Sequence, residues 1–319
     1  MSPLTYEPGF GNPKRLSDNV RPRGHATGFS SPGGFVFGGV FVGIGVFLVL
    51  FGLRIVEPGG RLNVPHWVLI PVGAVFAGAG LFTWVKIWRQ RQADHRHEQI
   101  RLWHPDEPAL ADYPWDPAGQ RSRLREHAVR ATLITGFFLL FLTPANYIAF
   151  FTKDAPWPMQ AIIGLFDLVT LYLFYDAALR WGRACKFGQA FLRFDRFPFS
   201  TREPVKLVWI APAGCAGEAT GRFTLRSVRE WYETTGGGKS RNTRLVHEQQ
   251  WSGSWMIATP ARITPGEVCE LVFELPADAP STALHAERPF FWELEVALSL
   301  PGLDFTETYL VPVYGPKRT

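Results

Sequence analysis

The chain has 319 residues, of which 46% are hydrophobic, 14% are aromatic and only 19% are charged. This composition is too apolar for an ordinary soluble chain of about two domains, so we expect part of it to lie in a membrane. The three cysteines, Cys185, Cys215 and Cys269, are too few and too scattered for a disulfide framework or a thiolate metal site. A net charge of +5 reflects topology in a membrane protein and does not indicate a nucleic-acid partner.

The N-terminal region leads into a predicted membrane hairpin. Residues 1–32 are rich in Gly, Pro and Arg and should not fold alone, so we expect a cytoplasmic interaction tail. Two uncharged stretches follow, at 33–53 and 67–85, and each is long enough to cross a hydrocarbon core of about 30 Å. The short link between them contains the turn residues of 57–60, which predicts a transmembrane hairpin over residues 33–85.

Small residues recur four positions apart on both predicted helices of this hairpin. Such spacing lets two helix backbones approach closely. The small residues are Gly34, Gly38, Gly39 and Gly43 on the first helix, and Gly73, Ala74, Ala77 and Gly78 on the second. They could mediate packing within the hairpin or dimerisation with another chain, and tethering favours packing within the hairpin.

A second predicted hairpin follows a long loop. The loop, residues 86–130, is mixed in charge and rich in Trp and Pro, so we expect it to lie against the C-terminal domain or a partner. Further apolar stretches at 131–151 and about 159–179 predict a transmembrane hairpin over residues 131–180.

Basic residues are distributed unequally around the four predicted spans. Sixteen Lys and Arg residues flank the spans on the side that holds the tail, the 86–130 loop and the segment after the fourth span, whereas only Arg54, Arg61 and Lys153 lie on the other side. The positive-inside rule therefore predicts a multi-pass protein of the bacterial inner membrane with both termini in the cytoplasm.

Beyond Lys186 the periodicity changes to short alternating runs separated by Gly, Pro and Ser at intervals of roughly ten residues. We expect residues 187–319 to form a cytoplasmic antiparallel β-sandwich of the arrestin or immunoglobulin type. Its predicted strands are 190–197, 205–210, 222–232, 244–251, 255–258, 268–275, 290–300 and 306–314. The predicted fold class is thus membrane α plus all-β, with four transmembrane helices in two hairpins before the sandwich.

Alternation within two of these strands identifies the expected core face. The apolar positions are Cys269, Leu271 and Phe273 in one strand, and Trp292, Leu294 and Val296 in the other. Acids occupy the intervening positions, among them Glu270, Glu293 and Glu295, and we expect them to face water.

The C-terminal segments ELVFELPADAPSTAL and FFWELEVALSLPGLDFTETYLVPVY resemble a region of arrestin-like sandwiches, in which a Leu-Pro turn precedes a long strand, a Pro-Gly and a final strand. Joined to glycine-rich helix hairpins, the chain resembles uncharacterised bacterial integral membrane proteins with a cytoplasmic arrestin-like β-sandwich. The resemblance to arrestin-like sandwiches covers roughly residues 187–319 and implies a protein-docking domain. No charged cluster in the sequence matches an arrestin's buried polar switch, so binding of phosphorylated receptors is not implied.

Asp167 is the most informative single residue. It lies about nine residues from the outer end of the fourth span, near the middle of the bilayer, where a charge costs several kcal/mol. Thr143 and Asn146 lie at the same depth on the third span. The carboxyl could be a protonation or ion site, or a neutral group that hydrogen-bonds across the helices. The second interpretation is favoured because a pump or channel usually shows more than one such group.

Signatures of catalysis and metal binding are absent from the sequence. His95, His97 and His104 lack the spacing of a helical metal-binding pair. There is no Gly-x-Ser-x-Gly, phosphate loop, His-Glu-x-x-His or dinucleotide fingerprint, and Ser281 with His285 is most simply a polar loop. We therefore expect no enzymatic activity, no cofactor, no metal and no small-molecule substrate.

These features predict a non-enzymatic membrane scaffold or accessory subunit, which docks its sandwich on a larger membrane protein complex and stabilises it. Respiratory and photosynthetic assemblies are complexes of this kind. The expected partners are subunits of such a complex and the lipid bilayer. The alternatives are a small channel or transporter that uses Asp167, and a membrane enzyme with an unrecognised site. Secondary transporters usually have more than four spans and contain internal repeats, so this alternative is less favoured.

Overall fold

The computed structural model describes residues 4–16, 23, 32–56, 65–103, 107–151, 155–236 and 242–315. The chain divides into two compact units. One, here called the helical unit, comprises residues 29–94 and 125–181. The other, here called the sandwich unit, comprises residues 1–28, 95–124 and 182–319 and contains the β-strands.

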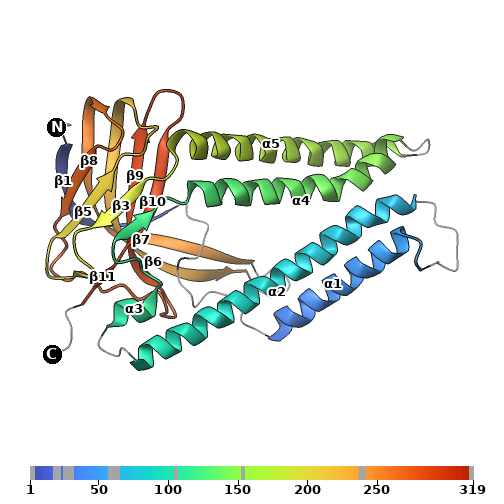
Figure 1. Cartoon of the computed structure of the whole chain (residues 1–319), viewed down its shortest axis with the longest axis horizontal. Coiled ribbons are helices and arrows are strands. Elements are labelled where there is room, and N and C mark those ends of the chain that lie inside the picture. The colour runs from blue at the N-terminus through green and yellow to red at the C-terminus, as the bar shows by residue number, and fades with distance from the viewer. Residues whose placement is uncertain are drawn as a thin grey trace. The chain divides into compact units, whose positions relative to one another are not determined.

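In the described part of the chain, four helices are long and apolar enough to cross a membrane. They are α1 (Pro32–Gly52), α2 (His66–Trp103), α4 (Leu124–Phe151) and α5 (Trp157–Phe187), all labelled in Figure 1. Only 11% to 22% of the residues in their most apolar windows are buried inside the protein. Helices with so much apolar surface facing outward suit a hydrocarbon surrounding. The prediction of four helices of spanning length is confirmed.

The helices extend beyond the predicted spans. The expected loop 86–130 is helical up to Trp103. Here α2 continues through a segment that contains no proline and is rich in Arg, Gln, Ala and Glu, which favour helix. Similarly, α4 begins at Leu124 and α5 ends at Phe187. The remainder of the expected loop includes the short helix α3 (Pro108–Asp112) and a strand.

Two antiparallel sheets form the body of the sandwich unit (Figure 1). The five-stranded sheet has the order β1 (Leu4–Arg15), β7 (Asn242–Ile263), β6 (Gly217–Thr235), β9 (Phe290–Ser299) and β10 (Phe305–Val311). The four-stranded sheet has the order β2 (Gly119–Arg121), β3 (Phe191–Phe194), β5 (Val205–Ile210) and β8 (Val268–Phe273). A parallel pair joins β4 (Phe199–Ser200) to β11 (Val313–Tyr314).

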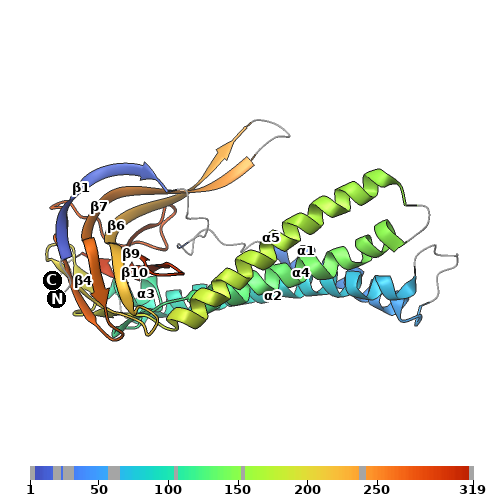
Figure 2. The ribbon, with the colours of Figure 1, turned by 90° about the horizontal axis from the view of Figure 1, so that it is seen from above.

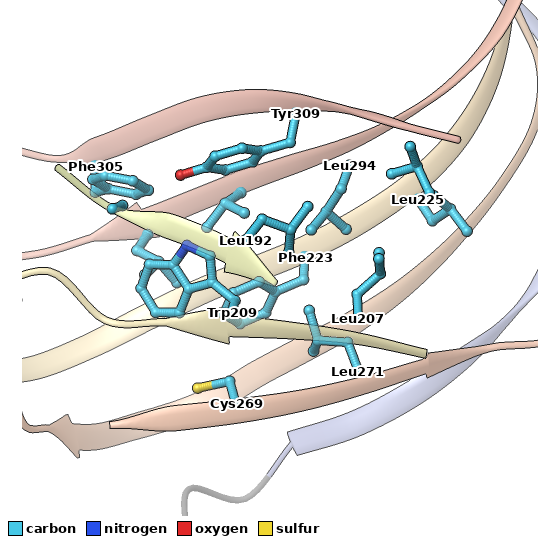
Figure 3. Packing of buried hydrophobic residues seen from close by; sticks show 14 of the residues in the cluster. Leu192, Leu207, Trp209, Phe223, Leu225, Cys269, Leu271, Leu294, Phe305 and Tyr309 are labelled. Atoms are coloured by element: carbon cyan, nitrogen blue, oxygen red, sulfur yellow. The ribbon is translucent and has the colours of Figure 1, made fainter. Parts of the chain in front are cut away.

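Side chains from both sheets fill the space between them, as Figure 3 shows. Trp209 of β5 packs edge-on against Phe223 of β6, with ring centroids 5.3 Å apart. The expected core positions Cys269, Leu271, Phe273, Trp292, Leu294 and Val296 are all buried. The prediction of an antiparallel β region after the helices is therefore confirmed.

The boundaries of the expected tail and loop need correction. Residues 4–15 of the expected interaction tail form β1, which pairs with β7. Residues 119–121 of the expected loop form β2, which pairs with β3. Both segments cover strand edges that would otherwise present unpaired backbone groups. Of the rest of the expected tail, residues 1–3, 17–22 and 24–31 lie outside the described residues.

The predicted strands 244–251 and 255–258 are parts of one long strand, β7. Its pairing with β1 ends at Glu248, and the pairing of β6 with β9 ends at Arg229. Beyond these points β6 and β7 continue as a two-stranded ribbon, which Figure 2 shows projecting from the sheet. Residues 231–235 and 242–246 of this ribbon are here called the β6–β7 arm.

Candidate functional site

Side-chain hydrogen bonds join α4 and α5 at several depths. Thr135 Oγ1 donates to the backbone oxygen of Leu173 at 3.1 Å. Further along the two antiparallel helices, Asn146 Nδ2 donates to Asp167 Oδ1 at 2.8 Å. In an apolar surrounding such a bond satisfies polar groups that would otherwise be costly to place there.

The structure brings two of the three residues of the predicted polar contact together. Asn146 and Asp167 are bonded, whereas Thr143 Oγ1 donates to the backbone oxygen of Leu139 in its own helix at 2.7 Å. The Thr143 hydroxyl hydrogen is therefore used within α4 and is not the donor to Asp167.

A cavity of about 290 Å³ lies beside the Asn146–Asp167 pair. Its apolar walls are Trp67, Leu139, Leu142, Tyr147 and Phe151, and its polar lining is Thr143, Asn146, Asp167 and Thr170. Trp67 packs edge-on against Tyr147 at 5.1 Å between ring centroids, and Tyr147 stacks on Phe151 at 6.0 Å. The cavity thus combines one carboxyl group and one carboxamide with aromatic walls.

Glycines bring the backbones of α1 and α2 into contact. A Cβ atom on Gly38 would lie 2.6 Å from Trp84 Cδ1, and one on Gly73 would lie 2.6 Å from the backbone oxygen of Gly45. These close approaches recur every seven residues. They involve Gly38, Gly45 and Gly52 on α1, and His66, Gly73 and Gly80 on α2.

The predicted packing residues divide into two groups. Gly34, Gly38, Gly73 and Ala77 lie in the contact between α1 and α2. A Cβ atom on Gly39 would lie at an ordinary contact distance of 3.5 Å from Trp84, whereas Gly43 and Gly78 have no neighbour within 4 Å of the position of a Cβ atom, so these two residues do not lie in the contact.

The two groups differ because the contact between α1 and α2 repeats at a different spacing from the one predicted. Helices that pack side by side over several turns meet about every seven residues, not every four. Gly45, Gly52 and Gly80 were therefore missed, although the seven-residue spacing of Gly38, Gly45 and Gly52 is visible in the sequence.

A network of buried charges lies on the face of the five-stranded sheet opposite the core. Arg226 of β6 donates through Nε to Glu293 Oε1 at 2.7 Å and through Nη1 to Glu295 Oε2 at 3.1 Å. The side chains of Arg226 and Glu293 are 5% and 0% exposed. Charges removed from water to this extent are tolerated only when they are paired and hydrogen-bonded.

The network continues through Arg23 to a second acid. The backbone N–H of Arg23 donates to Glu230 Oε2 at 2.6 Å, and its Nη2 lies 3.7 Å from Glu293 Oε2. His247 Nε2 lies 2.6 Å from Glu230 Oε2, and both side chains are fully buried. Residue 23 of the expected tail is therefore held against the sandwich.

The expectation that Glu293 faces water is wrong. A small apolar cluster of Val228, Leu284, Phe291 and Leu310, with Leu16, Tyr113 and Trp115 packed against it, lies beside Glu293, because Leu310 is the strand partner of Glu293. Sequence alternation marks Glu293 as opposite the core but cannot show that it is buried. Its partner Arg226 is 67 residues away, so the register that joins them cannot be read from the sequence.

Asp112, at the end of α3, fastens the expected loop to the sandwich. Its carboxylate accepts hydrogen bonds from the backbone N–H of Leu284 at 2.9 Å, from the Tyr314 hydroxyl at 2.9 Å and from His285. Burial acts to raise the pKa of Asp112, but the hydrogen bonds from His285, Leu284 and Tyr314 outweigh it and hold that pKa below its usual value. Burial raises the pKa of Tyr314, so its hydroxyl remains a donor.

The histidines considered as metal ligands have other contacts. His97 stacks on His285 with ring centroids 3.6 Å apart, and its Nδ1 lies 2.5 Å from the backbone oxygen of Ala111. His95 is exposed, and His104 lies outside the described residues. Among the residues that the structure describes, no three His, Cys, Asp or Glu side chains are grouped so that they could hold a metal ion.

The end of α5 lies within the sandwich unit. Phe187, its last residue, is fully buried in the sandwich core. Lys186 Nζ donates to the backbone oxygens of Pro301 at 2.8 Å and Leu303 at 3.0 Å. Leu124, the first residue of α4, belongs to the same core. The first residue of α4 and the last residues of α5 therefore belong to the sandwich unit.

Comparison with known proteins finds a weak structural likeness. No protein-family model and no curated protein matches the sequence. The crystal structure of Spo0M, a sporulation control protein from Bacillus subtilis with an arrestin-like fold, is similar over 40% of this chain, at 14% identity and a TM-score of 0.26. The matched part spans about half, 49%, of that protein. A TM-score this low assigns no family, so the fold class rests on the strand order and the core described above.

Proposed function

We propose that this protein is a non-enzymatic membrane scaffold, which docks its β-sandwich on other subunits of a larger membrane protein complex and stabilises that complex. The observation that carries the proposal is that α4 and α5 each run without a break from the helical unit into the sandwich unit. Phe187 is part of the sandwich core and Lys186 binds the turn at 301–303. A recruited module needs only a flexible tether, whereas a connection by continuous helices suits a platform on which other subunits assemble.

We further propose that the four helices cross the bacterial inner membrane, with both termini in the cytoplasm. The sixteen-to-three distribution of basic residues supports this topology. All three cysteines are free thiols, which suits a reducing compartment. A reporter enzyme that is active only in the periplasm should be inactive when fused after Thr319 and active when inserted within 57–64. Strong activity of the C-terminal fusion would overturn the topology.

The β6–β7 arm is the part of the sandwich that we propose touches the partner. A two-stranded ribbon is marginally stable by itself in water, so a projecting ribbon gains from contact with another surface. Tyr232 of the arm is 45% exposed, and aromatic residues of this kind are common anchors at protein interfaces.

Native electrophoresis after mild-detergent extraction tests the scaffold directly. We expect the wild-type protein to migrate together with other chains, and Tyr232→Asp to lose them. Val268→Asp is the matched control, because Val268 is an exposed apolar residue on a different sheet, at the start of β8. Migration of the wild-type protein as a bare monomer would contradict the scaffold. Loss of the partners in both variants would contradict the role of the arm.

The cavity at Asp167 supports a second candidate function, a small channel or transporter. A carboxyl group that lines a cavity among apolar helices is a common element of ion and proton pathways. The test is proton flux in vesicles that contain the purified protein. Flux that Asp167→Asn abolishes would favour transport over a purely structural role of this residue.

A further inference from the structure

The cavity beside Asp167 has hydrogen-bond acceptors in its wall. Thr143 and Thr170 donate their hydroxyl hydrogens to backbone oxygens of their own helices, at 2.7 Å to Leu139 and 2.9 Å to Phe166. Asn146 uses one N–H on Asp167 Oδ1. Asp167 Oδ2 accepts no hydrogen bond from the described residues. The carboxyl of Asp167 and the hydroxyl oxygens of Thr143 and Thr170 are therefore acceptors at the wall of a mainly apolar cavity.

The cavity also carries an acid without a basic neighbour in its lining. Among the described residues that line it there is no Lys, Arg or His, and Asp167 is the only acid. A carboxylate in such an apolar surrounding gains much from a positively charged ligand. A metal ion is a poor candidate, because Ca²⁺ takes six to eight oxygen ligands and Mg²⁺ demands a near-ideal octahedron.

Besides the carboxyl of Asp167, aromatic rings in the cavity wall can attract a cation. Trp67 and Tyr147 meet edge-on at 5.1 Å between ring centroids, and Tyr147 and Phe151 stack at 6.0 Å. Faces of Trp, Tyr and Phe attract ammonium groups, and this cavity is lined by one ring of each kind together with one carboxyl group. We propose that this cavity binds a lipophilic organic cation, an ammonium compound with an apolar body.

Size and access agree with such a ligand. A volume of about 290 Å³ is near the lower end of small-molecule sites, which begin at roughly 300 Å³, so the ligand is small. Leu139 and Phe151, which line the cavity, are exposed on the outer surface of the helices. The ligand would therefore enter from the hydrocarbon phase, which requires the apolar body. This site is independent of the proposed docking of the sandwich.

The test uses the full-length protein in lipid nanodiscs with benzyltrimethylammonium as the probe and titration calorimetry as the measurement. We expect saturable binding that Asp167→Asn weakens by about tenfold or more, because the carboxylate is lost while the size and the hydrogen bond to Asn146 are kept. Trp67→Leu should weaken binding by a few fold through loss of one ring. Asp176→Asn is the matched control on the same helix and should bind normally, because Asp176 pairs with Arg180 at 2.7 Å and does not line the cavity.

Neopentylbenzene separates recognition of charge from recognition of shape, since it replaces the ammonium nitrogen by carbon. We expect it to displace the cation only weakly. Equal affinity for both compounds, no saturable binding, or unchanged binding by Asp167→Asn would each overturn the proposal. Thermal unfolding of each variant in nanodiscs checks that it is folded. If Asp167→Asn unfolds, the comparison of the two compounds on the wild-type protein still decides the matter.

Discussion

The helical unit and the sandwich unit place the same kinds of side chain in opposite surroundings. Phe82 of α2 is 70% exposed, whereas Phe223 of β6 is fully buried. Burial of apolar surface stabilises the sandwich by roughly 25 cal/mol for each Å² removed from water. The apolar outer surface of the helices gains nothing of this kind in water and suits a hydrocarbon surrounding. Each unit is therefore built for a different solvent.

The two units differ in how they pair polar groups that lie away from water. The sandwich pairs full charges, as in Arg226 with Glu293, which are both buried. The helical unit places Asp167 against the uncharged amide of Asn146. The loss of one partner should therefore have a large effect in the sandwich and a small one in the helices.

The largest effect is expected for Glu293→Ala. This change leaves Arg226 buried without its closest acid, and breaking a buried ion pair costs about 3 to 5 kcal/mol. Urea unfolding of the detergent-solubilised protein, followed by tryptophan fluorescence, measures the loss. Glu270→Ala is the control, because Glu270 is exposed on β8 and should change the free energy of unfolding little. Equal effects of the two changes would show that the network adds no stability.

The next effect concerns the contact between α1 and α2. Gly45→Leu places a side chain against the backbone of Gly73 and Ala77, and overpacking of this kind costs about 1 to 3 kcal/mol. Gly43→Leu has the same chemistry, but no atom lies within 4 Å of the position of its Cβ, so it should be tolerated. Unfolding by SDS in mixed micelles measures the free energy of unfolding of both variants. If Gly43→Leu were the more damaging change, the helix contact would have been assigned to the wrong face.

The sequence predicts well those elements whose periodicity is strong and local. Residues 205–210 are predicted and observed as one strand, β5, because a short apolar run of β-branched and aromatic residues between turn signals has few other structures. Residues 4–15 show no such pattern, and β1 forms because β7 offers an edge to pair with. Tertiary context decides that strand, so the sequence alone does not reveal it.

In the candidate sites, too, contacts set by local geometry are predictable from the sequence, whereas contacts set by tertiary context are not. The constant rise of a helix allows depth to be counted along two antiparallel spans, and the structure places Asn146 beside Asp167. The partners of Arg226 and Asp112 depend on strand register and loop path instead. Their chemistry is visible in the sequence, but their contacts are not.

A smaller effect, with a defined pH dependence, is expected for Asp112→Asn. The folded pKa of Asp112 lies below its usual value near 4, so the carboxylate stabilises the fold above that value and loses its effect as the pH falls through the folded pKa. At pH 7 the substitution should cost about 1 to 3 kcal/mol, because one amide replaces a carboxylate that accepts several hydrogen bonds.

Urea unfolding of both proteins between pH 7 and pH 3 measures this dependence. The difference between wild type and Asp112→Asn should shrink as the solution becomes more acidic. A difference that stays constant over this range would mean that the charge of Asp112 does not contribute to holding α3 on the sandwich.

The smallest effect is expected in the helical unit, at Asp167. Asparagine keeps the size of the residue and its ability to bond Asn146, so Asp167→Asn should leave the free energy of unfolding nearly unchanged. Leucine removes the hydrogen bond, and Asp167→Leu should cost roughly 0.6 to 2 kcal/mol, the range measured for bonds between membrane helices. SDS unfolding in mixed micelles resolves such a difference. Asn146→Leu should cost a similar amount, and the double variant should lose no more than either single one, because both remove the same bond. Additive losses would show that Asp167 and Asn146 stabilise the helices separately, and the contrast with the charge network of the sandwich would then need another explanation than the bond between them.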